Sequence, residues 1–88
     1  MRLIILGAGG HGKVVADLAE QTGKYDAVYF LDDASNDSHV IGICSDFEKF
    51  NTPDTEMYPA FGNNTARVEW EDKIEGAGIK LAKIIHPL

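Results

Sequence analysis

The sequence is poor in the features that mark disulfide-bonded, membrane-spanning and nucleic-acid-binding proteins. Its single cysteine, Cys44, has no second cysteine for an internal disulfide, which is typical of a reducing compartment, and we expect a cytoplasmic protein. Its first apolar run, residues 3–6, is followed at once by glycine and is too short for a membrane span or a signal peptide. Eight Lys and Arg stand against fourteen Asp and Glu, for a net charge of -6. This charge repels phosphate backbones and anionic membranes, so we expect neither nucleic acid nor membrane as a partner.

The length of 88 residues predicts a single domain, residues 1–88. A chain of this size buries roughly 60–65% of its extended surface, which is enough for one small core. Hydrophobic residues make up 44% and charged residues 25%, as in a folded globular domain rather than a disordered chain. The length therefore excludes an enzyme that carries its own second substrate domain.

The first thirty residues have the pattern of a βαβ unit. Residues 3–6 form a continuous apolar run, typical of a strand buried on both faces, and residues 7–12 then break regular structure with glycines. A helical pattern follows and ends near Gly23, and residues 27–31 form a second apolar run. The helical pattern predicts one buried face made of Val14, Val15, Leu18 and Ala19. Strand, glycine turn, helix and strand in this order predict a right-handed parallel crossover.

The remainder of the chain extends this pattern. We expect a short extended segment at residues 40–43, a helical turn capped by Ser45 or Asp46, and a strand over residues 55–61. Pro59 cannot donate to a sheet ladder, so it must lie at an edge or a strand end.

A helix is predicted from residue 65 to residue 75, ended by Gly76 and Gly78, and a last strand over residues 79–85, stopped by His86 and Pro87. The predicted fold is α/β: a small, Rossmann-like, open parallel sheet with helices on both faces.

The glycines after the first strand have the G-x-G-x-x-G spacing at Gly7, Gly9 and Gly12. In this position, between a strand and a helix, the first glycine allows a tight turn, the second a close approach of phosphate, and the third close packing of helix on strand. The helix N-terminus offers free N–H groups and a partial positive charge to an anion. Lys13 would add a full charge, so the turn predicts a phosphate-binding site.

An acidic pair follows the second strand. Asp32 lies twenty residues beyond Gly12, where dinucleotide-binding folds place an acid that accepts hydrogen bonds from ribose hydroxyls. An ionised carboxylate there disfavours a 2′-phosphate. In the competing interpretation the glycines only build the turn, and Asp32 and Asp33 only solvate the strand end.

The histidines and the cysteine give weaker signals. His11, within the glycine turn, is placed to donate to a phosphate or sugar oxygen, and this interpretation is favoured over that of an exposed turn residue. His39 and His86 have no Cys, Asp or Glu at metal-ligand spacing, so we expect no metal site. Cys44 lacks a basic neighbour in the sequence and is interpreted as a packing residue rather than a nucleophile.

A second constellation, Gly62-Asn63-Asn64-x-x-Arg67, follows the third long strand and opens a helix. It should therefore lie on the same carboxyl edge as the glycine turn, where open α/β sheets bind ligands. A helix cap with a surface arginine is an equally good interpretation of these residues. Within this helix, Val68 and Trp70 are predicted to face the core.

Four segments together resemble one family: residues 5–15, residues 30–33, residues 61–67 and the closing residues 84–87. The chain is similar over essentially its whole length to the amino-terminal domain of bacterial sugar O- and N-acyltransferases. These include the sialic-acid O-acetyltransferase and UDP-N-acetylbacillosamine N-acetyltransferase types. Pro59 departs from the family pattern, which has an uninterrupted apolar strand there.

The resemblance implies a domain that binds a UDP-sugar, with the diphosphate near the helix amides and the uridine and ribose near the acids. In the family a left-handed β-helix of hexapeptide repeats follows, forms the trimer, binds acetyl-CoA and supplies the catalytic histidine. The 88 residues contain no such repeats. We therefore expect no catalytic residue and no bound cofactor in this domain, with acetyl-CoA used by the full-length family.

The expected ligand contacts combine the residue patterns and the resemblance: Gly7, Gly9, Gly10, His11, Gly12, Lys13, Asp32, Asp33, Gly62, Asn63, Asn64 and Arg67. Two other functions stay open from the sequence. The chain could be a fragment of an NAD-type dinucleotide-binding protein, because the glycines and Asp32 fit such a site equally well. It could also be a non-catalytic interaction or scaffold domain that keeps the fold alone.

Overall fold

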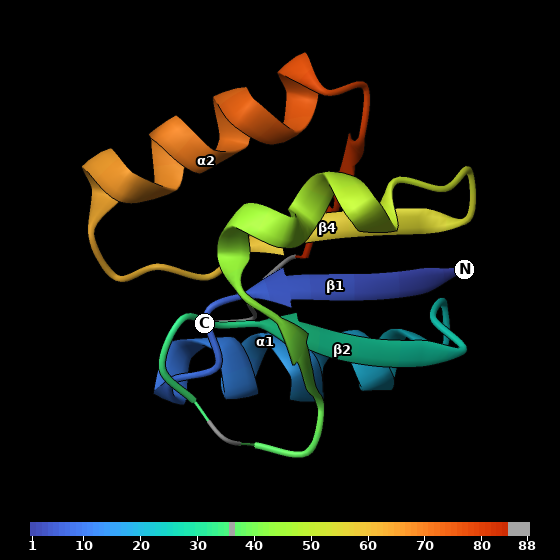
Figure 1. The fold of residues 1–88 in the computed structure, drawn as a ribbon. Coiled ribbons are helices and arrows are strands. Elements are labelled where there is room, and N and C mark those ends of the chain that lie inside the picture. Colours follow the sequence, from blue (N-terminus) through green and yellow to red (C-terminus); the bar gives the residue numbers. More distant parts are fainter. Residues whose placement is uncertain (36, 85–88) are drawn as a thin grey trace.

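The computed structural model describes residues 1–35 and 37–84 and shows one five-stranded parallel sheet with the strand order β3-β2-β1-β4-β5 (Figure 1). The strands are β1 (Arg2–Leu6), β2 (Ala27–Leu31), β3 (Val40–Gly42), β4 (Thr55–Pro59) and β5 (Lys80–Leu81). The helices are α1 (Gly10–Thr22), the 3₁₀ helix η1 (Cys44–Phe50) and α2 (Asn64–Gly76). Across the described residues, every helix falls short of the length and apolarity that crossing a bilayer requires. The predicted fold class is confirmed.

Strand β1 lies at the centre of the sheet because its apolar side chains are needed on both faces. Ile4 is in register with Tyr29 of β2 on one side and with Met57 of β4 on the other. Leu3 and Ile5 belong to the core beneath α1, whereas Ile4 and Leu6 belong to the core beneath η1 and α2. The continuous apolar run therefore predicts its two-sided burial correctly.

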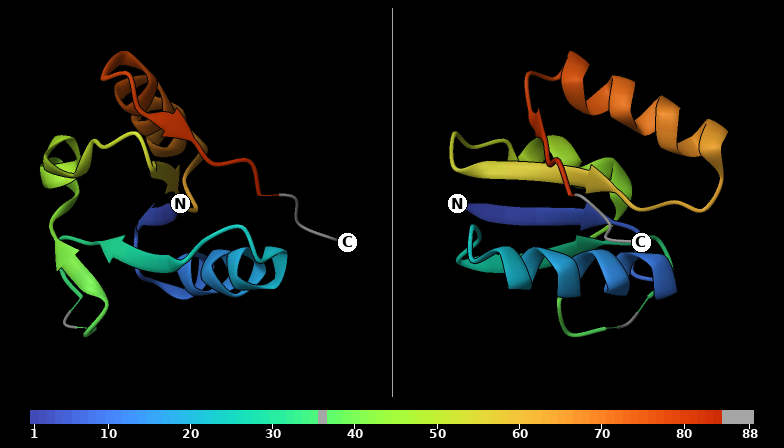
Figure 2. Two further views of the ribbon diagram at one scale, coloured as in Figure 1. Left: turned by 90° about the vertical axis from the view of Figure 1, so that its right-hand side faces the viewer. Right: turned by 180° about the vertical axis from the view of Figure 1, so that it is seen from behind.

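Helix α1 covers one face of the sheet, and η1 and α2 cover the opposite face (Figure 2). The buried side of α1 is a narrow stripe of small residues made of Gly12, Val15 and Ala19. Val14 is 44% exposed, so its predicted place in the core is wrong. The reason is geometric, because small side chains bring α1 close to the sheet and narrow its buried face. Val14 is turned by about 100° around the helix axis from Val15 and therefore points away from the sheet.

Helix α2 shows a similar difference. Trp70 packs edge-on against Phe47 of η1, with ring centroids 5.4 Å apart, and lies 6.2 Å from the Phe61 ring. Its predicted core position is confirmed. Val68 is 49% exposed, so its predicted core position is wrong. Only one side chain per turn of α2 reaches the core near Val68, because Trp70 and Ile74 fill the contact with η1 and β4.

The third long strand is shorter than predicted and ends at Pro59 instead of residue 61. The N–H of Ala60 donates to Leu6 of β1, so the preceding residue faces the other side, toward β5. Strand β5 pairs only with Glu56 and Met57, so the missing N–H of Pro59 falls beyond the last ladder position. The proline is therefore at a strand end, as one of the two predicted options required.

The last strand is also shorter than predicted. The expectation was residues 79–85, but β5 comprises only Lys80–Leu81, which pair with Glu56 and Met57 of β4; the ladder is not extended at Pro59, which has no N–H to donate. Residue 85 and the predicted stop at residues 86–87 lie outside the described residues. The N-cap of η1 is Ile43 and neither Ser45 nor Asp46 as predicted; Asp46 lies at the third helical position, and its carboxylate accepts the Ile43 N–H at 3.2 Å.

Candidate functional site

The carboxyl ends of β1, β2 and β4 meet at one edge of the sheet, together with the first turns of α1 and α2 (Figure 1). Strand β1 leads into a helix on one face, and its neighbour β4 leads into a helix on the other. Such a reversal makes a crevice between the two loops, and open α/β sheets bind their ligands there. This position contains both predicted motifs.

The glycine turn after β1 depends on two of its three glycines for its shape. Gly7 has a φ of 102°, and a Cβ on it would lie 3.1 Å from the carbonyl oxygen of Ala60. A Cβ on Gly12 would collide with the carbonyl oxygen of Gly7 and would lie 3.5 Å from the Phe30 ring. The tight turn at Gly7 is confirmed. Gly12 allows close packing as predicted, with the turn itself as the main neighbour.

The other glycines of the turn face open space. A Cβ on Gly9 or Gly10 would have no neighbour within 4 Å. Gly9 is the N-cap of α1 and supplies no side-chain cap, and the first turn of the helix contains no acidic residue. His11 is exposed beside them. The first backbone N–H groups of a 13-residue helix are thus presented at an open surface, as an anion requires.

The Lys13 side chain already forms an ion pair within the chain. Its ammonium lies 3.7 Å from a carboxylate oxygen of Asp37, which belongs to the loop between β2 and β3. The same carboxylate accepts the backbone N–H of His39 at 2.9 Å, and this hydrogen bond is the main reason its pKa is lowered. The pair therefore links the first turn of α1 to the neighbouring loop.

Asp32 makes three hydrogen bonds to the backbone of its own chain. Its Oδ2 accepts the N–H of Ala8 at 2.7 Å, and its Oδ1 accepts the N–H groups of Ala34 and Ser35 at 2.8 Å each. The hydrogen bond from Ala8 is the main cause that lowers the pKa of Asp32. Since a carboxylate offers about four acceptor positions, little capacity is left for a ligand hydroxyl.

Asp33 differs from its neighbour. Its side chain is exposed, and Oδ1 accepts the N–H of Cys44 at 2.9 Å. Both acids thus do more than solvate the strand end, and Asp33 keeps the larger unused acceptor capacity.

The second loop touches the first. The Phe61 ring lies 3.5 Å from the position of a Cβ on Gly7, so the loop after β4 packs against the glycine turn. Asn63 caps α2 through Oδ1, which accepts the Ala66 N–H at 3.1 Å. Gly62 and Asn64 are exposed, and Arg67 is half-buried in the first helical turn. The structure therefore brings the two predicted motifs together and also confirms the capping interpretation for Asn63.

Cys44 is a packing residue, as predicted. Its thiol is buried between the sheet and η1 and lies 3.5 Å from the carbonyl oxygen of Leu31. Burial raises the pKa of this thiol to about 12, and the nearby Asp33 contributes in the same direction. Within the described part of the chain, no three His, Cys, Asp or Glu side chains are grouped to hold a metal ion.

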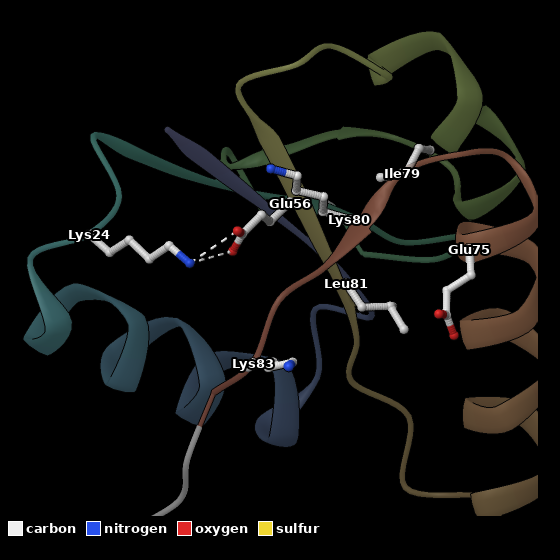
Figure 3. Close-up of a pocket in the computed structure, with 7 residues that line it drawn as sticks. All are labelled: Lys24, Glu56, Glu75, Ile79, Lys80, Leu81 and Lys83. Carbon is white, nitrogen blue, oxygen red and sulfur yellow. Dashed lines mark hydrogen bonds and ion pairs between the residues drawn. The ribbon is translucent and has the colours of Figure 1, made fainter.

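One pocket, of about 460 Å³, was not predicted from the sequence; it is lined by Lys24, Glu56, Glu75, Ile79, Lys80, Leu81 and Lys83 (Figure 3). It lies beside the first residues of β4, at the end of that strand opposite the loop that follows Pro59. The buried Glu56 accepts hydrogen bonds from Lys24 at 3.0 and 3.1 Å and from Tyr25 at 2.6 Å. Burial opposes its ionisation, but these hydrogen bonds outweigh burial and lower the pKa of Glu56.

The polar groups of this pocket do not converge on a ligand. The ammonium groups of Lys80 and Lys83 point in different directions, and the Glu56 carboxylate is already engaged by Lys24 (Figure 3). A glutamate inside an otherwise apolar strand was the only sequence signal available. The Lys24–Glu56 pair accordingly joins the end of α1 to β4, and the carboxyl edge remains the better candidate site.

Comparisons with known proteins agree with this geometry. The family model of the PglD N-terminal domain matches residues 2–74. A solved structure described as the acetyltransferase domain of PglB from Neisseria gonorrhoeae FA1090 is 40% identical, with a TM-score of 0.88. It is matched over 98% of this chain and 44% of its own.

A second structure of the same domain of PglB from Neisseria gonorrhoeae FA1090 is a complex with acetyl coenzyme A. It is 38% identical, with a TM-score of 0.84, and the match again covers 98% of this chain and 44% of that chain. The present chain thus spans less than half the length of either solved structure.

Proposed function

Because the chain belongs to the PglD N-terminal domain family, we propose that it is the nucleotide-sugar-binding domain of a sugar acetyltransferase. The supporting observation is the contact between the glycine turn at Gly7 and the loop at Phe61. These two loops lead from neighbouring strands to helices on opposite faces of the sheet. Two predicted ligand-binding motifs from distant parts of the sequence lie in contact there. The matched acetyltransferase domain supports the assignment of the reaction class.

The proposed ligand is a UDP-sugar that lies along the carboxyl edge. Its diphosphate takes hydrogen bonds from the open N–H groups at the start of α1, near Gly9, Gly10 and His11. Gly7 and Gly12 shape that turn, and Lys13 supplies charge from its flank. The uridine and ribose lie toward Asp32 and Asp33, at the end of β2.

The sugar of this ligand extends toward the second loop. Gly62 and Asn64 are exposed there, and Asn63 and Arg67 lie in the first turn of α2. Amide and guanidinium groups suit sugar hydroxyls and acetamido oxygens, because they donate hydrogen bonds without adding a negative charge. The residues of this loop would therefore select among nucleotide sugars.

In the acetyl transfer, an amine or hydroxyl of the bound sugar attacks the thioester carbonyl of acetyl-CoA while a general base accepts its proton. We assign no base to this chain, whose part is to bind and orient the sugar. Under this proposal the acetyl-CoA site, the base and a trimer interface are left to a part of the protein outside this domain, as the family resemblance implies. An acetyl-CoA-dependent reaction and a free buried thiol both favour a cytoplasmic location.

The decisive experiment is titration calorimetry of the purified chain with UDP, a UDP-sugar and NAD. We expect saturable binding of UDP and the UDP-sugar, and weaker or no binding of NAD. Gly9→Val should weaken UDP binding because its side chain would occupy the open space above the helix amides. Glu20→Gln, an exposed change in the distant half of α1, is the matched control.

The other outcomes are equally informative. Tighter binding of NAD than of UDP would replace the proposal with a dinucleotide-binding function. Failure of all three ligands to bind would favour an interaction or scaffold domain. A circular-dichroism melt of each variant separates lost binding from lost folding.

A further inference from the structure

We infer that Asp32 is a positioning residue of the nucleotide site: its carboxylate holds the glycine turn in shape and does not itself contact the ligand. The inference rests on the proposed function. It departs from the role of ribose acceptor that the spacing between Gly12 and Asp32 suggests. The Ala8 N–H, 24 residues away in sequence, is the link between the acid and the turn.

The hydrogen bonds of Asp32 leave it facing the protein. Oδ2 is taken by the Ala8 N–H at 2.7 Å, and Oδ1 is shared by the Ala34 and Ser35 N–H groups at 2.8 Å each. These bonds are charge-assisted, and they occupy three of the about four acceptor positions of the carboxylate. A ligand contact would therefore have to compete with three backbone donors.

Ala8 explains why this matters for the site. The residue is buried, so its N–H would lack a partner without Asp32, at an appreciable cost in free energy. The preceding residue, Gly7, donates its N–H to Leu31 of β2 at 2.7 Å. Two successive N–H groups are thus fixed to the end of β2, and the peptide that leads into Gly9 and α1 takes its orientation from them.

The neighbouring acid provides the contrast. Asp33 is exposed and accepts one backbone N–H, from Cys44 at 2.9 Å. In the proposed site it is the better placed of the two carboxylates to accept a ribose hydroxyl. The two adjacent acids at the end of β2 thus have different roles in the proposed site: Asp32 positions the turn, and Asp33 faces the ligand.

The first test needs no ligand. In amide hydrogen exchange of the free protein, the N–H of Ala8 should be protected, whereas the open N–H of Gly10 should exchange freely. In Asp32→Asn, exchange at Ala8 should accelerate at least about tenfold, because one side-chain oxygen cannot serve three donors. An unprotected Ala8 in the wild type would overturn the inference, even if the variants do not fold.

The second test uses UDP, 2′-deoxy-UDP and 3′-deoxy-UDP as probes on the wild type, Asp32→Asn, Asp32→Ser and Asp33→Asn. If Asp32 is a positioning residue, its substitution weakens the binding of all three probes equally, on the order of tenfold. The ratio of the affinity for UDP to the affinity for each deoxy probe is then the same as in the wild type. A ratio that falls to one in the Asp32 variants would show direct contact and overturn the inference. In Asp33→Asn, by contrast, we expect this affinity ratio to fall to one.

The two proposals fail separately. If the wild type does not bind UDP, the proposed function is wrong and the ligand-facing part of this inference falls with it. The exchange data then still decide whether Asp32 holds the turn. If UDP binds but Asp32→Asn changes neither affinity nor exchange at Ala8, the positioning role is wrong and the proposed function stands.

Discussion

Gly12→Ala tests the packing of the glycine turn most directly, because the added methyl would collide with the carbonyl oxygen of Gly7. The oxygen is a backbone atom and the Cβ is bonded directly to the backbone, at the junction of β1 and α1, so neither can move away by a change of rotamer. Forced overpacking costs about 1–3 kcal/mol. We take about 3 kcal/mol for this collision and subtract about 1 kcal/mol for the better helix propensity of alanine. The expected net loss is about 2 kcal/mol of unfolding free energy.

The assay is urea unfolding followed by circular dichroism, together with a thermal melt. For a domain of this size, a loss of about 2 kcal/mol lowers the melting temperature by roughly 8–16 °C. Gly10→Ala is the matched control, because a Cβ there meets no atom within 4 Å and its stability should stay within about 0.5 kcal/mol of the wild type. Equal stability of Gly12→Ala and Gly10→Ala would refute the close packing on which the site geometry depends.

Three further results are expected. Asn63→Ala should cost about 1 kcal/mol in urea unfolding, because the Ala66 N–H loses its cap, and an unchanged midpoint would refute the cap. Cys44, whose pKa burial raises to about 12, should react with iodoacetamide at pH 8 on the order of a thousandfold more slowly in the folded protein than in urea. The lowered pKa of Asp32 adds stability that is present above its unfolded pKa, about 3.9, and is lost as pH falls through the folded value. Acid unfolding should therefore be less steep in Asp32→Asn, and identical profiles would contradict this contribution.

The strands were predictable where the sequence pattern reports burial on both sides. Residues 3–6 are apolar without alternation, and the structure buries all four of them. The pattern does not report pairing, which depends on the partner strand. The predicted strand over residues 79–85 pairs only at Lys80–Leu81, since Pro59 of β4 has no N–H with which to extend the ladder.

Side-chain orientation on the helices was harder to predict. Val14 and Val68 fit an apolar helical stripe, yet both are largely exposed. The width of such a stripe depends on how close the helix lies to the sheet, and for α1 this distance is set by Gly12 and Ala19. Hydrophobicity alone carries no information about that distance, so the periodicity overestimates the buried face.

The candidate site was predictable as a place but not as a set of contacts. The spacing of the glycines predicts the turn because Gly7 and Gly12 have steric requirements that only glycine satisfies, whereas Gly9 leaves open space at the helix N-terminus. The partners of Asp32 and Lys13 depend instead on loops that the fold brings near, namely Ala8 and Asp37. Such contacts follow from tertiary structure, which the local sequence does not encode.

The hydrogen bonds of Asp32 change what a glycine fingerprint followed by an acid implies. An acid at the end of β2 that accepts the Ala8 N–H stabilises the glycine turn in the free protein, whatever ligand binds. Its presence therefore cannot distinguish a dinucleotide from a nucleotide sugar, although both need the anion site at the start of α1. Discrimination must come from groups that remain free to face the ligand. In the proposed site those groups are the Asp33 carboxylate and the exposed loop at Gly62 and Asn64, which lies on the opposite side of the glycine turn.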